Sequence, residues 1–107
     1  MPIYNKLVRD KIPEIIAQSG KMCRVRSLSP VEIGPMLRAK LQEELTEYLE
    51  ALNDAEAAQE LADILEVIFA LGTVHGVEPD RLLALQQEKR DARGGFAEGL
   101  FLIDVDD

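Results

Sequence analysis

The apolar residues of this chain recur mainly at the three- and four-residue spacing of an α-helix. Three long segments show this period, and a shorter one precedes them and ends at Gly20. The predicted helices cover residues 10–19, 36–53, 55–74 and 79–92. The sequence therefore predicts a mainly α fold, a small helical bundle with two long acidic helices, in a single domain over residues 1–107.

The start of the second predicted helix carries two conflicting signals. Ser29, Pro30 and Glu32 form a capping box, which marks a helix N-terminus. Gly34 and Pro35 follow, and a proline inside a helix removes one backbone hydrogen bond. We therefore expect a break or kink at this point, with the long helix running from about residue 36.

Two short segments favour extended structure over helix. Residues 22–28, MCRVRSL, alternate apolar and polar side chains, and the tail over 100–105, LFLIDV, is also typical of a strand. The pattern predicts that these two segments pair as a two-stranded ribbon on one side of the helices.

Acidic residues lie beside the apolar stripes of the two central helices. Glu44 adjoins the stripe of the first, and Glu47 lies next to it, three residues on. On the second, Glu60 falls within the apolar arc and Asp63 lies at its edge. A short turn joins the two helices, so we expect them to pack antiparallel with their stripes facing. That packing would bring the four carboxylates together.

Four neighbouring carboxylates repel one another unless positive charge lies among them. Protons, lysine or arginine side chains, or a metal ion can supply that charge. Oxygen ligands alone suit hard cations such as Mg²⁺ or Mn²⁺. Glutamates beside an apolar stripe also commonly mark the solvated edge of a helix, so the pattern by itself leaves a metal site and simple surface charge both open.

Charge and cysteine content narrow the function classes. The 107 residues include 20 acidic and 12 basic side chains, a net charge of -8, which argues against a nucleic-acid or anionic-membrane partner. Cys23 is the single cysteine, so no disulfide can form within the chain, and we expect a reducing, cytoplasmic location. The most apolar stretch is too short to span a bilayer.

The acidic pattern resembles the signature of a known superfamily. Glu43-Glu44-x-x-Glu47 followed by Glu60-x-x-Asp63 is similar to the EExxE and ExxD motifs of the all-α nucleoside triphosphate pyrophosphohydrolases. The segments YNKLVRDKIPEII and EKRDARGGF resemble a small MazG-like, phosphoribosyl-ATP pyrophosphohydrolase-like branch. The resemblance covers essentially the whole chain.

The resemblance implies an enzyme that cleaves a nucleoside triphosphate, including noncanonical ones, between the α and β phosphates. It implies Mg²⁺, or alternatively Mn²⁺, bound by Glu44, Glu47, Glu60 and Asp63. Glu43 would be a further ligand or the group that orients the attacking water. The resemblance also implies a homodimer or homotetramer with its site near the subunit interface.

A triphosphate also needs positive side chains at the rim of an acidic site. The candidates are Lys6, Arg9 and Lys11 near the start of the chain, and Lys89, Arg90 and Arg93 near the end of the last helix. Lys89 also suits the dipole at a helix C-terminus. A helical interaction or nucleotide-binding module without turnover, with its acids as surface charge, is the competing hypothesis.

Overall fold

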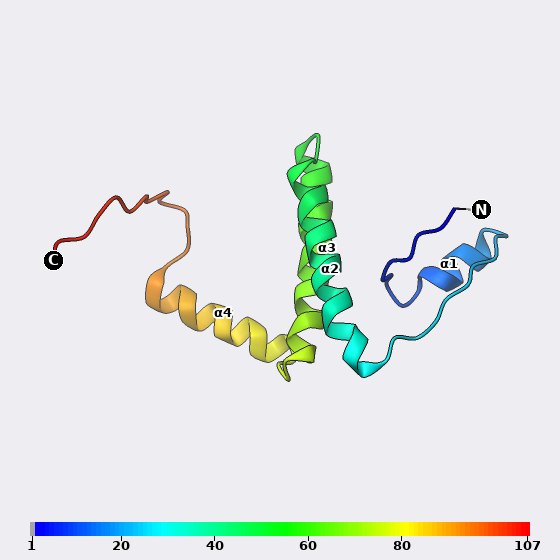
Figure 1. Ribbon diagram of the computed structural model, residues 1–107. Coiled ribbons are helices and arrows are strands. Elements are labelled where there is room, and N and C mark those ends of the chain that lie inside the picture. The colour runs from blue at the N-terminus through cyan, green and yellow to red at the C-terminus, as the bar shows by residue number, and fades with distance from the viewer. Residues whose placement is uncertain (1) are drawn as a thin grey trace.

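A computed structural model describes residues 2–107 and contains four α-helices (Figure 1). They are α1 (Ile12–Gln18), α2 (Pro30–Leu49), α3 (Asp54–Val74) and α4 (Pro79–Arg93). No strand occurs over residues 2–107. The predicted mainly α fold is confirmed, and each predicted helix has a counterpart in the structure.

The α2–α3 hairpin is the centre of the molecule. The two helices run antiparallel and pack along their lengths, and α4 contacts the far end of α3 (Figure 1). The turn between them is closed by reciprocal bonds: the Asn53 side chain accepts from the backbone N–H of Glu56 at 2.8 Å, and the Glu56 carboxylate accepts from the N–H of Leu52 at 3.1 Å. This turn fixes how α3 faces α2.

Of the break or kink predicted at Pro35, the break is wrong, because α2 begins at Pro30 rather than at residue 36 and continues through Pro35. Its first turn is held firmly: the Glu32 carboxylate accepts from the backbone N–H and the hydroxyl of Ser29, each at 3.0 Å, and from Arg26 at 2.8 Å. Gly34 packs where an added Cβ would lie 3.5 Å from the Val74 side chain. These contacts outweigh the single backbone hydrogen bond that Pro35 removes.

The predicted ribbon is also wrong. Residues 22–28 and 100–105 are irregular, and they lie on opposite sides of the hairpin, the first leading into α2 and the second leaving α4 (Figure 1). Their side chains are largely exposed, as Met22 (98%) and Phe101 (90%) show. An alternating pattern forms a strand only beside a partner, and neither segment has one in reach.

Few apolar side chains are buried within one chain. Leu37 and Val67 are the buried apolar side chains of the described residues. The radius of gyration is 18.2 Å, against about 13 Å for a compact chain of this length. Along residues 2–107, no helix has the length and apolar character needed to cross a membrane. The central hairpin is therefore a thin two-helix layer with much of its apolar surface uncovered.

Gly72 lets α4 approach α3 closely. A Cβ there would lie 2.8 Å from the carbonyl oxygen of Val77 and 3.3 Å from the Leu82 side chain. The backbone N–H of Val77 also donates to the carbonyl of Gly72 at 2.8 Å. The turn after α3 therefore has no room for a side chain at this position.

We predict that Gly72→Ala lowers the free energy of unfolding by about 1–3 kcal/mol, because the methyl group forces the turn away from α3. Gly34→Ala is the matched control: its methyl meets only an ordinary contact, and the loss of unfolded-state entropy should stabilise the protein by about 0.4–1 kcal/mol. Urea denaturation of both variants measures the difference. Equal effects of the two substitutions would contradict the close-approach explanation.

Candidate metal centre

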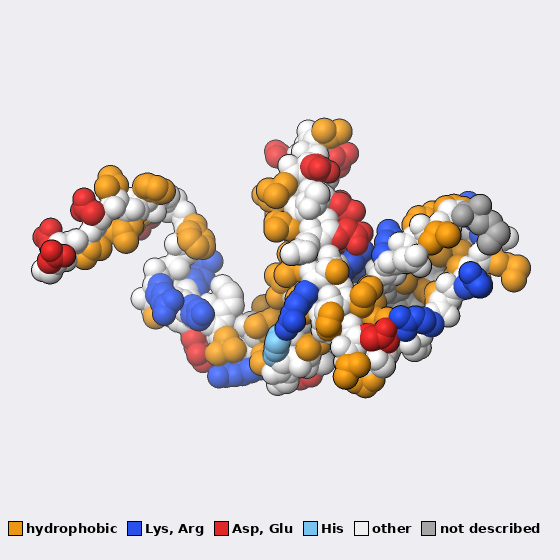
Figure 2. Space-filling view, in the orientation of Figure 1, with side chains coloured by type: hydrophobic (Ala, Val, Ile, Leu, Met, Phe, Trp, Pro, Cys, Tyr) orange, Lys and Arg blue, Asp and Glu red, His pale blue; other side chains and the backbone are white. Residues whose placement is uncertain are grey.

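Five acidic residues converge where α2 faces α3. Side-chain oxygens of Glu43, Glu44 and Glu47, from successive turns of α2, lie within 4.8 Å of one another. Oxygens of Glu44, Glu60 and Asp63 form a second group of the same size, which bridges the two helices. The structure thus brings together all the carboxylates that the sequence pattern singled out. Figure 2 shows acidic side chains gathered on the upper half of the hairpin, and Asp63 of the cluster contacts Arg9 of the segment that precedes α1.

Glu44 belongs to both groups and is the buried member of the cluster. Only 6% of the residue is exposed. Its Oε2 and the Oε2 of Glu60 are both buried without a hydrogen-bond partner in the protein. Buried carboxylate oxygens normally have partners, because their desolvation is costly. Two such oxygens, on residues of the same acidic group, fit the ligand set of a hard divalent cation.

Lys40 is a member of this site that the sequence reasoning missed. Its Nζ lies 3.1 Å from Oε1 of Glu44 and 3.3 Å from Oε1 of Glu43, and its side chain is only 17% exposed. The signal was present in the sequence, since Lys40 stands three and four residues before those glutamates on one helix. The lysine neutralises part of the cluster from the α2 side.

The pKa values within the cluster diverge. Burial alone would raise the pKa of Glu44, but hydrogen bonds, first of all from Lys40, lower it overall. A hydrogen bond with Glu44, together with partial burial, raises the pKa of Glu47 to about 7. Burial is the main cause that raises the pKa of Glu60, and the charge of Glu44 acts in the same direction. Without a metal, the cluster therefore retains protons near neutral pH.

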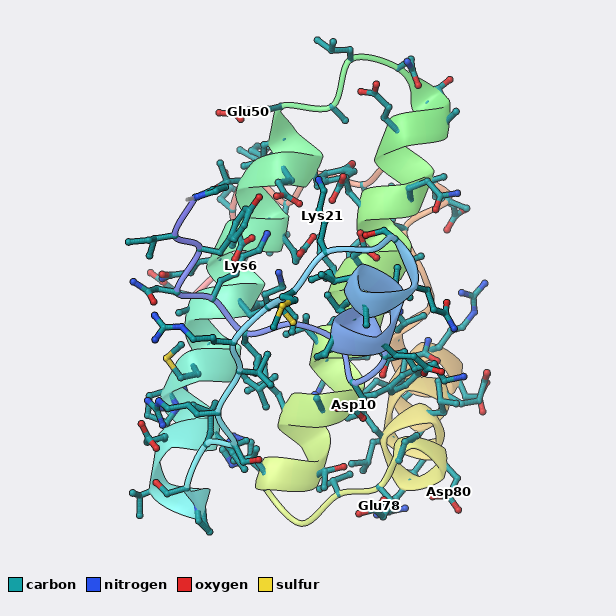
Figure 3. The ribbon with its side chains drawn as sticks, turned by 90° about the vertical axis from the view of Figure 1, so that its right-hand side faces the viewer. Lys6, Asp10, Lys21, Glu50, Glu78 and Asp80 are labelled. Atoms are coloured by element: carbon teal, nitrogen blue, oxygen red, sulfur yellow. The ribbon has the colours of Figure 1, made fainter. Side chains whose placement is uncertain are left out.

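The N-terminal arm, residues 2–11, reaches the cluster through one residue. Arg9 Nη2 donates to Asp63 Oδ1 at 2.6 Å, with both side chains about half exposed. Lys6 lies in front of α2 in the view of Figure 3, and its Nζ is 5.5 Å from the centre of the Tyr4 ring. Lys11 is exposed and precedes α1 as its N-cap residue. Of the basic residues predicted in the arm, Arg9 makes an ion pair with the acidic cluster.

Lys89 and Arg93 lie elsewhere. They line a groove of about 910 Å³ formed by α3, α4 and the segment after α4, together with apolar side chains such as Leu85 and Phe96. Because α4 leaves the hairpin on the side away from α1, this groove does not face the acidic cluster of the same chain (Figures 1 and 2). The structure therefore does not bring these two residues together with the carboxylates.

Comparison with known proteins points to one family. The model of the phosphoribosyl-ATP pyrophosphohydrolase family matches residues 24–90, which include α2, α3 and most of α4. An uncharacterized protein of Mycolicibacterium smegmatis is 47% identical over 55 residues, which are 51% of this chain and 55% of that protein. The chain therefore spans about half the length of this relative. No solved structure matches the chain.

We predict that the metal-free protein becomes less stable as pH rises from about 4.5 to about 7. The pKa of Glu47 is 4.5 in an unfolded chain and about 7 in the folded one, so folding takes up a proton in this window. Glu60, whose pKa is also raised, acts in the same direction. Urea denaturation in the presence of a chelator, across this pH range, measures the slope.

Glu47→Gln should flatten that slope, because the amide does not titrate. Glu50→Gln, an exposed acid one turn further along the chain, is the control and should leave the slope as in the unmodified protein. Stability that rises with pH through this window, or a slope that Glu47→Gln leaves unchanged, would contradict the prediction.

Proposed function

Because the chain belongs to the phosphoribosyl-ATP pyrophosphohydrolase family, within the MazG-like all-α superfamily, we propose that it is a Mg²⁺-dependent nucleoside triphosphate pyrophosphohydrolase. It cleaves an NTP or dNTP between the α and β phosphates and releases the monophosphate and pyrophosphate, with noncanonical nucleotides as its target class. One observation carries the proposal: the Glu44 carboxylate, buried within a cluster of acids from two helices, has an oxygen without a hydrogen-bond partner in the protein.

The proposed metal ligands are Glu44, Glu47, Glu60 and Asp63. All are carboxylates, which favours Mg²⁺, with Mn²⁺ as a substitute, over softer metals that prefer nitrogen or sulfur. If held by these residues, the cation would reverse the negative sign of the pocket, supply positive charge for a triphosphate and lower the pKa of a bound water. An acidic cluster can accept a triphosphate only with that change of sign.

Other side chains of this chain then position the substrate and the water. Glu43, which Lys40 holds at 3.3 Å, is the proposed group that orients the attacking water. Arg9 already lies beside Asp63, within reach of a phosphate that approaches the cluster, and Lys6 and Lys11 add positive charge on the same arm. Phosphoryl transfer needs mainly positioning and charge neutralisation, which these groups supply.

The proposal includes a homodimer or homotetramer. Large apolar side chains on the hairpin are exposed in one chain, among them Leu45 (47%), Leu49 (72%) and Leu65 (47%). A chain that buries so little apolar surface gains stability by covering it with a second copy. Lys89 and Arg93 do not face the acidic cluster of their own chain. In the assembly, we propose that Lys89 and Arg93 of a neighbouring subunit contact the phosphates. We place this assembly in the cytoplasm, where a protein with a single, exposed thiol stays reduced.

The exposed apolar surface also favours a second candidate, a helical interaction module that binds nucleotide without turnover. A panel of NTPs, dNTPs and noncanonical triphosphates with Mg²⁺, assayed for pyrophosphate, separates the two. Release of pyrophosphate from at least one nucleotide supports the enzyme. No release from any of them, together with no thermal shift on adding Mg²⁺ or Mn²⁺, would favour the module.

Glu44→Gln and Asp63→Asn should each lower pyrophosphate release by about 100-fold, because each removes a charged oxygen ligand. Glu50→Gln, exposed at the end of α2, is the control and should keep full activity. Circular dichroism checks that all three variants keep their helices. Full activity of the folded Glu44→Gln variant would exclude this cluster as the catalytic site.

We predict that the protein sediments as a dimer or tetramer and that Leu49→Asp dissociates it. Leu49 is 72% exposed in one chain, so the charge disturbs an interface without disturbing the fold of the chain itself. Val31→Asp introduces the same charge at an equally exposed position near the other end of α2 and serves as the control. Sedimentation velocity gives the answer, and a monomeric unmodified protein would contradict the proposed assembly.

A further inference from the structure

The acidic cluster offers two positions for a cation, and they share Glu44. One position lies among Glu43, Glu44 and Glu47 on α2, and the other lies among Glu44, Glu60 and Asp63 between the helices. Each of the three carboxylates in either group contributes an oxygen within 4.8 Å of the others. By acid count alone, the two positions are equivalent, so the number of acids does not decide between one ion and two.

The two positions differ in what the protein itself places there. The Lys40 ammonium contacts both Glu43 and Glu44 on the α2 side, and its side chain is mostly buried. By contrast, Oε2 of Glu44 and Oε2 of Glu60, two residues that meet only in the interhelical group, are buried without partners. Oε1 of Glu44 thus pairs with the lysine, while its Oε2 has no partner in the protein.

We propose that the Lys40 ammonium is the permanent cation of the α2 position, so that the cluster binds a single divalent ion, on the side of Glu44 that faces Glu60 and Asp63. This inference rests on the metal-dependent function proposed above and specifies that it uses one ion. Of the four ligands proposed there, it assigns Glu44, Glu60 and Asp63 to that ion and leaves Glu47 in the α2 group. Lys40 is a positioning residue: it acts through Glu44, whose free oxygen it directs towards the ion.

The ammonium suits this role because it is tethered and shielded. Its side chain comes from the same helix as both acids, three and four residues before them, so no other element has to move for it to stay in contact. Lys40 donates a charge-assisted hydrogen bond to Glu43, which is stronger than a neutral one, and forms an ion pair with Glu44. A second divalent ion would have to displace this buried cation before it could bind three carboxylates of α2.

Arg9 provides the contrast. Its guanidinium also neutralises one acid of the cluster, Asp63, but it contacts a single carboxylate, its side chain is 54% exposed, and it comes from a separate segment of the chain. Exposed pairs of this kind contribute little stability. A divalent ion at the interhelical position can therefore replace Arg9 at Asp63, whereas Lys40 stays where it is. A divalent ion can thus take the place of Arg9 at the interhelical position, but it cannot take the place of Lys40 at the α2 position.

The test counts ions directly, without relying on catalysis. Mn²⁺ is titrated into the full-length protein, and free Mn²⁺ is measured by electron paramagnetic resonance. The unmodified protein and Lys40→Arg should bind one ion per chain. Lys40→Met keeps the aliphatic stem but removes the charge, and should bind two. Arg38→Met removes one positive charge from an exposed position on the same helix, and should stay at one.

A second comparison keeps the proposal testable if Lys40→Met does not fold. With Lys40 unchanged, Glu43→Gln should change the dissociation constant of Mn²⁺ by less than about threefold. Glu60→Gln should raise that constant by about tenfold or more, because of these two acids only Glu60 faces the ion. Equal effects of the two substitutions would overturn the inference.

Two Mn²⁺ ions on the unmodified chain, or a folded Lys40→Met that binds one ion with unchanged affinity, would also overturn it while leaving a metal-dependent enzyme intact. An unmodified protein that binds no Mn²⁺ would overturn the proposed function as well. The failure of the inference and the failure of the function are thus separate results.

Discussion

The burial of one carboxylate, that of Glu44, between the two central helices governs the design of this site. A charged group taken out of water is tolerated only where opposite charge or strong donors surround it. Here Lys40 satisfies one oxygen, and the other is left without a protein partner. The arrangement is unfavourable for a simple scaffold and suitable for a ligand, because an ion that binds there supplies the missing interaction.

The hairpin turn makes that burial possible. The reciprocal bonds of Asn53 and Glu56 fix the start of α3, and Glu60 and Asp63 follow on successive turns. Glu60 faces Glu44 from the opposing helix at the same level. The site therefore needs no loop to place its acids, since helical spacing and an antiparallel turn are sufficient. Rigid elements of this kind hold ligand groups more accurately than loops do.

Local signals in the sequence predicted most of the fold. Apolar period and caps located all four helices, and the position of acids beside apolar stripes predicted their convergence. Two local expectations failed. In the first, contacts elsewhere in the fold decided the outcome, and in the second, the partner that the prediction required is missing. Pro35 did not break α2, since the capping box and the packing of Gly34 against Val74 held its first turns. Residues 22–28 and 100–105 formed no strands, since neither lies beside a partner.

The side chains around the acids were harder to predict than the acids themselves. Lys40 was overlooked although its spacing to Glu43 and Glu44 is visible in the sequence, because a lysine on an acidic helix usually makes a weak solvated pair. Only the burial of the Lys40 side chain, which the sequence does not reveal, distinguishes this ion pair from a weak surface pair. The pairing of Arg9 with Asp63 joins residues 54 positions apart, and no local pattern encodes such a contact.

In the proposed homo-oligomer, the thin core of the hairpin would tie the fold of this protein to its abundance. Where apolar side chains are covered only by another copy, association and folding share one free energy. Dilution of that assembly would then lower the stability of each chain, although every bond inside the chain could still form. The rate of synthesis would become one determinant of how long each molecule survives proteolysis, and a small pool of the protein would turn over faster than a large one.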